Sequence, residues 1–152
     1  MHDEANLTQL IYISKAIDDL SRHDLRDILS SSQKNNFRLN ITGILVFSNG
    51  KFMQFLEGSS LNIMNTFKTI NNDFRHHSID VVRQGDITRR QFEGWHMRHI
   101  DTCEILENSG IIYDKLFSKK DMTEDANNLA IESSSWLLAF KHANEVDQPY
   151  NY

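Results

Sequence analysis

A tight β-hairpin is the element that the sequence indicates most clearly. Asn49-Gly50 separates two apolar segments, residues 41–47 (ITGILVF) and residues 51–58 (KFMQFLEG). Both residues of the dipeptide tolerate positive φ, as the central positions of a two-residue turn require. The second segment carries large apolar side chains on both faces of the expected strand: Phe52 and Leu56 on one face, Met53 and Phe55 on the other. A sheet built on this hairpin therefore needs a covering layer on each side.

The segments around the hairpin predict five strands and two helices. Ser21 opens the segment SRHD, a Ser-x-x-Asp helix start, and Ser59 or Ser60 is positioned to cap a second helix that runs through Ile70. Apolar and β-branched runs predict strands. The expected strands are residues 7–13, 41–47, 51–58, 79–85 and 94–100, and the first helix is residues 21–35. The order βαββαββ is typical of an α+β, ferredoxin-like sheet with two helices on one face.

The C-terminal third is expected to be helical. Residues 101–145 are expected to form a cap or output region, with one helix interrupted near Gly110 and another capped by Thr123. Residues 146–152 are expected to form a tail. The second helix carries one stripe of side chains: Leu129, Ser133, Trp136 and Phe140. The pattern predicts that C-terminal helices cover the other face of the sheet.

Charge and cysteine content exclude several classes of function. The 152 residues suffice for one core, residues 7–100. With 16 Lys and Arg against 21 Asp and Glu, the net charge of −5 disfavours direct binding to nucleic acid. A single cysteine, Cys103, provides neither a disulfide framework nor a thiolate zinc cluster, and the adjacent His76 and His77 diverge, so no metal site is expected. Without a signal peptide or long apolar run, the chain is expected to be cytoplasmic and not to enter a membrane.

A carboxamide in an apolar strand is the first candidate for chemistry. Gln54 lies between Met53 and Phe55, and its amide has four hydrogen-bonding positions to satisfy. It can bond a neighbouring backbone group. Alternatively, because the first and third strands of a ferredoxin-like sheet are neighbours, it can meet the phenol of Tyr12.

Two further polar pairs have both a structural and a functional interpretation. Asn35 and Asn36 end the first helix, where one can serve as a C-cap or both can bind the edge of a planar heterocycle. Arg75 and His76 follow the second helix, as a solvated helix end or as a pair available to a phosphate. Cys103 has no basic neighbour to activate it, so nucleophilic catalysis has no support.

Five segments together resemble one family. LIYIS near the start is followed by SSQKNNFRLNITGILVF, FMQFLEG, DFRHHSI and FEGWHM. In this order, over about residues 7 to 100, they resemble a BLUF domain, a blue-light sensor that uses FAD. The resemblance implies a noncovalent flavin between the two core helices, with its ring edge facing the sheet.

The resemblance also implies a role for each matching residue. Tyr12 corresponds to the photoactive tyrosine and Gln54 to the switching glutamine, while Asn36 matches the amide that binds the carbonyl edge of the flavin. The set expected to contact the cofactor is Ser14, Ser32, Asn35, Asn36, Gln54, Arg75, His76, Trp95 and Met97.

The chemistry implied for these residues is a reversible rearrangement of hydrogen bonds. Excited flavin takes an electron from Tyr12, a proton follows, and Gln54 relays it. Gln54 ends either rotated or as its imidic tautomer, and it donates a new hydrogen bond to the flavin carbonyl that shifts absorption to the red. Because nothing turns over, the protein is expected not to be an enzyme.

The output is expected to be a change in binding to a separate, unidentified downstream protein. About 50 residues follow the core, which leaves no room for a cyclase or phosphodiesterase domain, and self-association into a homo-oligomer is expected. Two alternatives stay open: a flavin-dependent redox enzyme, and a cofactor-free ferredoxin-like interaction module.

Overall fold

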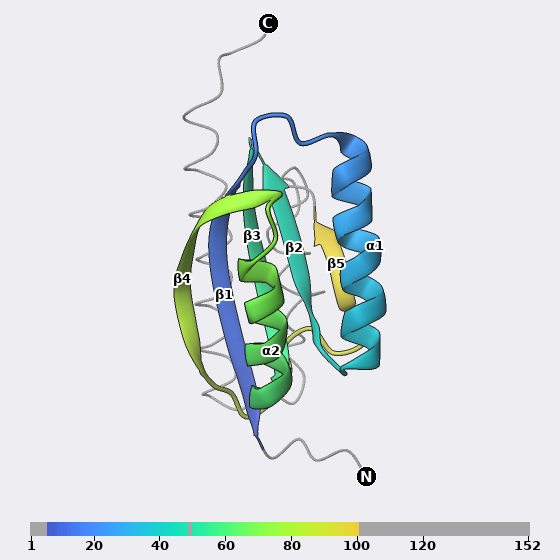
Figure 1. Cartoon of the computed structure of the whole chain (residues 1–152). Coiled ribbons are helices and arrows are strands. Elements are labelled where there is room, and N and C mark those ends of the chain that lie inside the picture. The colour runs from blue at the N-terminus through green and yellow to red at the C-terminus, as the bar shows by residue number, and fades with distance from the viewer. Residues whose placement is uncertain (1–5, 49, 101–152) are drawn as a thin grey trace, which may run out of the picture.

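The computed structural model describes residues 6–48 and 50–100 and confirms the predicted order of elements (Figure 1). The predicted C-terminal helices and tail lie outside the described residues. The strands are β1 Leu7–Ala16, β2 Thr42–Ser48, β3 Lys51–Ser59, β4 His76–Asp86 and β5 His96–Ile100, and the helices are α1 Arg22–Arg38 and α2 Ser60–Asn71. Among the described residues, no helix is long and apolar enough to cross a membrane.

The five strands form one sheet in the order β4-β1-β3-β2-β5. β1 is antiparallel to both β3 and β4, β2 is antiparallel to β3, and β5 runs parallel to β2. The hairpin closes with Ser48 opposite Lys51, as a two-residue turn at 49–50 predicts. Both helices lie on one face of the sheet, with α2 against β1 and β3 and α1 against β2 and β5 (Figure 1).

Local signals in the sequence fix where the helices begin. Ser21 Oγ accepts a hydrogen bond from the Asp24 backbone N–H at 3.0 Å, and the Asp24 carboxylate accepts one from the Ser21 backbone N–H at 3.0 Å. This capping box confirms the predicted start of α1. Ser59 caps α2 by accepting from the Asn62 backbone N–H at 3.3 Å.

Four boundaries differ from the predicted ones by two residues or more. β1 continues to Ala16 instead of ending at residue 13. α1 continues to Arg38, three residues beyond the predicted end, because the chain turns only at Asn40, which adopts a positive φ of 53°. β4 begins at His76 rather than at residue 79, and β5 begins at His96 rather than at residue 94. The two asparagines at positions 35 and 36 therefore lie within the last turns of α1 and are not its C-cap.

Both faces of the central hairpin are buried, as the alternation predicts. Leu10, Phe52 and Leu56 form a core with side chains of α1 and α2. Met53 and Phe55, on the opposite face, are also fully buried. Phe92, in the connection between β4 and β5, packs on Phe55 with their ring centroids 5.6 Å apart.

Gly43 allows β2 to pass close to its neighbours. A Cβ atom at this position would lie 1.8 Å from the Phe55 carbonyl oxygen and 3.3 Å from the Cε atom of Met97. The Gly43 backbone N–H also donates to the Trp95 carbonyl oxygen at 2.8 Å. The glycine is therefore needed for space between β3 and β5.

Gly43→Ala is expected to destabilise the protein by about 1–3 kcal/mol, because the backbone of β3 must move to admit the methyl group. Chemical denaturation of the full chain measures the effect. Gly85→Ala is the matched control, since a Cβ on this β4 glycine meets no atom within 4 Å. Equal free energies of unfolding for the two variants would contradict the steric argument.

Candidate functional site

A cavity of about 500 Å³ lies between the two helices and the sheet. β1 and β3 supply its floor through Tyr12, Phe52 and Gln54. α1 and α2 supply the walls, and the segment that follows α2 supplies Asp73, Arg75 and His76.

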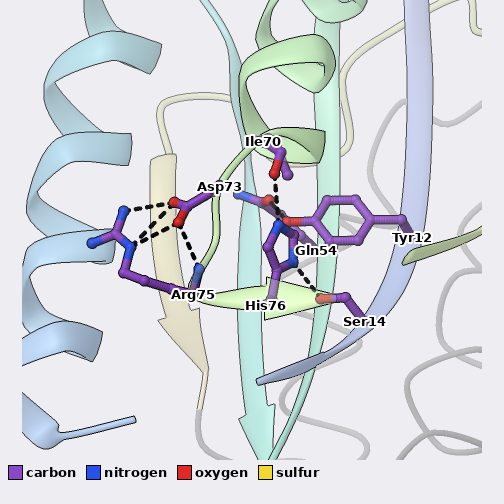
Figure 2. Close-up of polar contacts among 7 residues, drawn as sticks. All are labelled: Tyr12, Ser14, Gln54, Ile70, Asp73, Arg75 and His76. Carbon is purple, nitrogen blue, oxygen red and sulfur yellow. Dashed lines mark hydrogen bonds and ion pairs between the residues drawn. The ribbon is translucent and has the colours of Figure 1, made fainter. Parts of the chain in front are cut away.

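Tyr12 and Gln54 form the polar centre of the site. They are direct cross-strand partners on β1 and β3, and the Tyr12 hydroxyl donates a hydrogen bond to Gln54 Oε1 (Figure 2). The Gln54 amide Nε2 donates in turn to Met97 Sδ at 3.3 Å. Of the two interpretations of Gln54, the structure supports the contact with Tyr12, since both hydrogen bonds of the Gln54 carboxamide go to side chains and neither goes to the backbone.

Burial keeps the Tyr12 phenol protonated. The ring lies under the helices, and removal from water raises the pKa of Tyr12 well above its ordinary value; the negative charge of Asp73 raises this pKa further. The hydroxyl is therefore a hydrogen-bond donor throughout the physiological pH range.

His76 joins the end of α2 to β1. Its Nε2 lies 2.6 Å from the Ile70 carbonyl oxygen and its Nδ1 lies 2.8 Å from Ser14 Oγ (Figure 2). Because a carbonyl only accepts, Nε2 carries a ring proton, and in the neutral ring Nδ1 accepts from the Ser14 hydroxyl. Both ring nitrogens are thus engaged within the protein, while the imidazole still lines the cavity.

Arg75 pairs with Asp73 beside the cavity. Nε and Nη2 of Arg75 donate to Asp73 Oδ1 and Oδ2 at 3.0 and 2.6 Å, on the side of the cavity toward α1 (Figure 2). These hydrogen bonds lower the pKa of the Asp73 carboxyl below its ordinary value, despite partial burial. The sequence did not single out Asp73, although the spacing Asp73-x-Arg75 is the signal for such a pair.

Two polar groups in the cavity wall lack partners among the described residues. Asn36 is almost fully buried on α1, and its Nδ2 makes no hydrogen bond. Thr66 Oγ1 on α2 is also a buried atom that makes no hydrogen bond. Ser32 and Asn35 lie beside Asn36 on the cavity side of α1. A buried amide donor without an acceptor costs about 1–3 kcal/mol, so these groups fit a ligand that brings acceptors to the wall.

The two candidates near β5 occupy different surroundings. Met97 is fully buried against Gln54, and Gln33 Nε2 on α1 donates to its carbonyl oxygen at 3.1 Å. Trp95 precedes β5, is half-buried, and packs under the Arg98 guanidinium, whose carbon lies 4.4 Å from the ring centroid. Met97 has a φ of 112°, which breaks the regular alternation that predicted a shared strand face for Trp95 and Met97.

The structure therefore gathers most of the predicted site residues. Those that line the cavity are Tyr12, Ser32, Asn35, Asn36, Gln54, Arg75 and His76. Ser14 and Met97 touch this set through His76 and Gln54. Trp95 is not among the lining residues. In the part of the chain that the structure describes, no three His, Cys, Asp or Glu side chains gather as metal ligands do.

The cavity in this ferredoxin-like fold has a phenol–carboxamide pair on its floor and an unsatisfied amide in its wall. These features are typical of a protein that binds a planar heterocycle. The family model for sensors of blue-light using FAD matches residues 7–98. The chain belongs to this family, the BLUF domains, and it is a blue-light sensor whose cofactor is FAD.

Relatives with known names are also light-responsive proteins. The photoactivated adenylate cyclase subunit beta of Euglena longa is 37% identical over 89 residues, which are 59% of this chain and 10% of that protein. The blue light- and temperature-regulated antirepressor BluF of Escherichia coli is 29% identical over 124 residues, which are 78% of this chain and 30% of that protein. The chain thus spans a small part of the length of these relatives.

Solved structures show the same architecture. BlrB, described as a BLUF protein in its dark state, superposes with a TM-score of 0.65 at 29% identity and covers 84% of this chain and 97% of its own. BlrP1 of Klebsiella pneumoniae superposes with a TM-score of 0.72 at 31% identity and covers 87% of this chain and 34% of its own.

The residues present fit a flavin. A flavin ring has a carbonyl edge that accepts hydrogen bonds, and the buried Asn36 amide lacks an acceptor. The neighbouring Ser32 and Asn35 extend this polar wall, and the Arg75–Asp73 pair lies beside it.

Asn36→Ala is expected to weaken FAD binding by about tenfold or more, because the variant loses a buried donor to the ligand. Titration of the apoprotein with FAD, followed by flavin fluorescence, measures the dissociation constant. Lys34→Ala, an exposed position on the same helix, is the control. Unchanged affinity in Asn36→Ala would remove this residue from the binding site.

Proposed function

We propose that this chain is a light-switched binding protein in which Tyr12, Gln54 and Met97 form the switch. The observation that supports the proposal is the continuous chain of contacts from the phenol, through the carboxamide, to the thioether of β5. FAD, when bound, absorbs blue light and becomes a strong oxidant.

Tyr12 and Gln54 are arranged to move a proton. The phenol hydrogen points at Gln54 Oε1, so a proton that leaves Tyr12 arrives on the carboxamide. Gln54 can then settle in a second arrangement, either by side-chain rotation or as its imidic tautomer. One neutral hydrogen bond contributes about 1 kcal/mol, so exchanging such bonds is reversible and acts by shifting populations.

Rotation of Gln54 has a direct consequence for Met97. The rotated carboxamide turns Nε2 toward the Tyr12 oxygen and Oε1 toward Met97 Sδ. A thioether accepts hydrogen bonds and has none to donate, so oxygen then faces sulfur without a proton between them. Met97 must move away, and β5 with it. The tautomer keeps a nitrogen toward sulfur, so displacement of Met97 distinguishes the two mechanisms.

We further propose that the signal passes to a partner protein and that no substrate is turned over. Reversible movement of β5 changes a surface, and the light-regulated cyclase and antirepressor among the relatives are proteins in which light controls a further activity. The chain is expected to be cytoplasmic and to form a homo-oligomer without direct contact to nucleic acid. Analytical ultracentrifugation in the dark and under blue light tests self-association; a monomer in both states would overturn that part.

Gln54→Leu and Tyr12→Phe are expected to bind FAD and to lose the light-induced red shift, because each removes one end of the proton path. Absorption spectra before and after blue light measure the shift. Gln84→Leu is the matched control, since Gln84 makes the same kind of amide-to-thioether contact, with Met64 Sδ at 3.3 Å, on an exposed part of β4. A normal red shift in Gln54→Leu would overturn the proposed switch.

A further inference from the structure

A buried carboxylate, Glu57, lies on the face of β3 that points away from the cavity. It is fully buried and belongs to the same strand as Gln54, three residues further along. Nothing in the proposed switch uses it. Its side chain meets the connection that joins β4 to β5 and that leads directly into Met97.

Glu57 holds this connection by its backbone. Its Oε1 accepts from the Phe92 backbone N–H at 2.6 Å and its Oε2 accepts from the Gln91 backbone N–H at 2.9 Å. The Thr42 hydroxyl on β2 also donates to Oε1, at 2.8 Å. Arg90 Nη1 reinforces the junction by donating to the Glu57 carbonyl oxygen at 3.1 Å and to Thr42 Oγ1 at 2.9 Å.

Gln9 on β1 stands directly opposite Glu57 in the ladder. Cross-strand partners point to the same face and lie within side-chain reach. Gln9 is completely buried, yet neither Oε1 nor Nε2 of its carboxamide has a hydrogen-bond partner among the described residues. An unused donor next to a carboxylate marks a second possible arrangement, in which Gln9 Nε2 replaces the backbone of the connection.

We propose that Glu57 and Gln9 form a two-position latch: Glu57 holds the β4–β5 connection, and thereby Met97, in the dark arrangement, and bonds to Gln9 when the connection is released. Glu57 is a positioning residue, since it acts on the switch through Met97. The role in signalling rests on the proposed function, whereas the hold on the connection stands on the contacts of the carboxylate.

The latch depends on the proton of Glu57. Burial raises the pKa of Glu57 to about 7, against the opposing effect of the hydrogen bonds from Gln91, Phe92 and Thr42 and of the Arg90 charge. The facing groups from β1 and β2, Gln9 and Thr42, are uncharged. Release of the connection admits water to the carboxyl, whose pKa then returns toward its ordinary, lower value. The form in which Glu57 holds the connection therefore binds the proton more tightly, and this hold weakens as the pH rises from the ordinary pKa of a glutamate to about 7.

Hydrogen exchange of the Gln91 and Phe92 amides tests the hold without light. The full chain with FAD is measured in the dark between pH 5 and pH 9, and each rate is divided by its intrinsic rate. In the wild type, protection is expected to fall by up to about tenfold per pH unit as the pH rises toward 7, where only the held form binds the proton, and to stay constant above pH 7. In Glu57→Gln, which imitates the protonated acid, protection is expected not to vary with pH. Equal pH profiles in the two proteins would overturn the latch.

Three further variants sharpen this test. Glu93→Gln removes an exposed carboxylate from the same connection and is expected to behave as the wild type. Gln9→Leu removes the alternative donor and is expected to raise protection across the whole range. Thr42→Val removes one hydrogen-bond donor to the carboxylate, so the pH at which half of the amide protection is lost is expected to rise by about one unit. This variant tests the proposal even if Glu57→Gln does not fold. An unmoved midpoint in Thr42→Val would count against the proposal.

Dark recovery of the absorption shift tests the link to signalling. Recovery is expected to be slower at pH 8 than at pH 6 in the wild type, and fast at both in Glu57→Gln. A light response whose recovery has the same pH dependence in both proteins would overturn this link. Absence of any red shift in the wild type would instead reject the proposed function, and the exchange experiment would still decide whether Glu57 holds the connection.

Discussion

The hydrogen bond from Tyr12 to Gln54 organises the rest of the site. It exists because β1 and β3 are adjacent and place these two residues directly opposite each other. Because Gln54 Oε1 accepts the hydrogen bond from the Tyr12 phenol, Gln54 Nε2 faces Met97. One buried bond thus sets the orientation of the carboxamide, and the carboxamide sets the position of a side chain on β5. Burial of Tyr12 keeps its proton in place, so the direction of this hydrogen bond is well defined.

β3 carries polar side chains to both faces of an otherwise apolar sheet. Gln54 points into the cavity, and Glu57 points to the opposite face. Both reach the segment that contains Met97, one through its thioether and the other through the connection that precedes it. A change at the cavity and a change at the back of the sheet therefore act on the same short segment, and its backbone, with a φ of 112° at Met97, is already in a sparsely populated conformation.

Local patterns in the sequence predicted most of this architecture. The turn at residues 49–50, the capping box at Ser21 and strand alternation were sufficient for the order of elements, and strand adjacency brought Tyr12 to Gln54. The surroundings of Trp95 and Met97 could not be predicted, because Met97 adopts a positive φ that is uncommon outside glycine and that no local pattern signals. The partners of Glu57 in the β4–β5 connection were equally hidden, since those two donors are backbone groups more than thirty residues away.

The absorption spectrum of the purified protein in the dark, after blue light and again after a dark interval tests whether this chain is a reversible light switch. We expect a flavin spectrum that moves slightly to the red and returns without any added substrate. A flavin that bleaches and needs an oxidant to recover would contradict it and indicate redox chemistry. A protein that stays colourless after addition of FAD would contradict it as well.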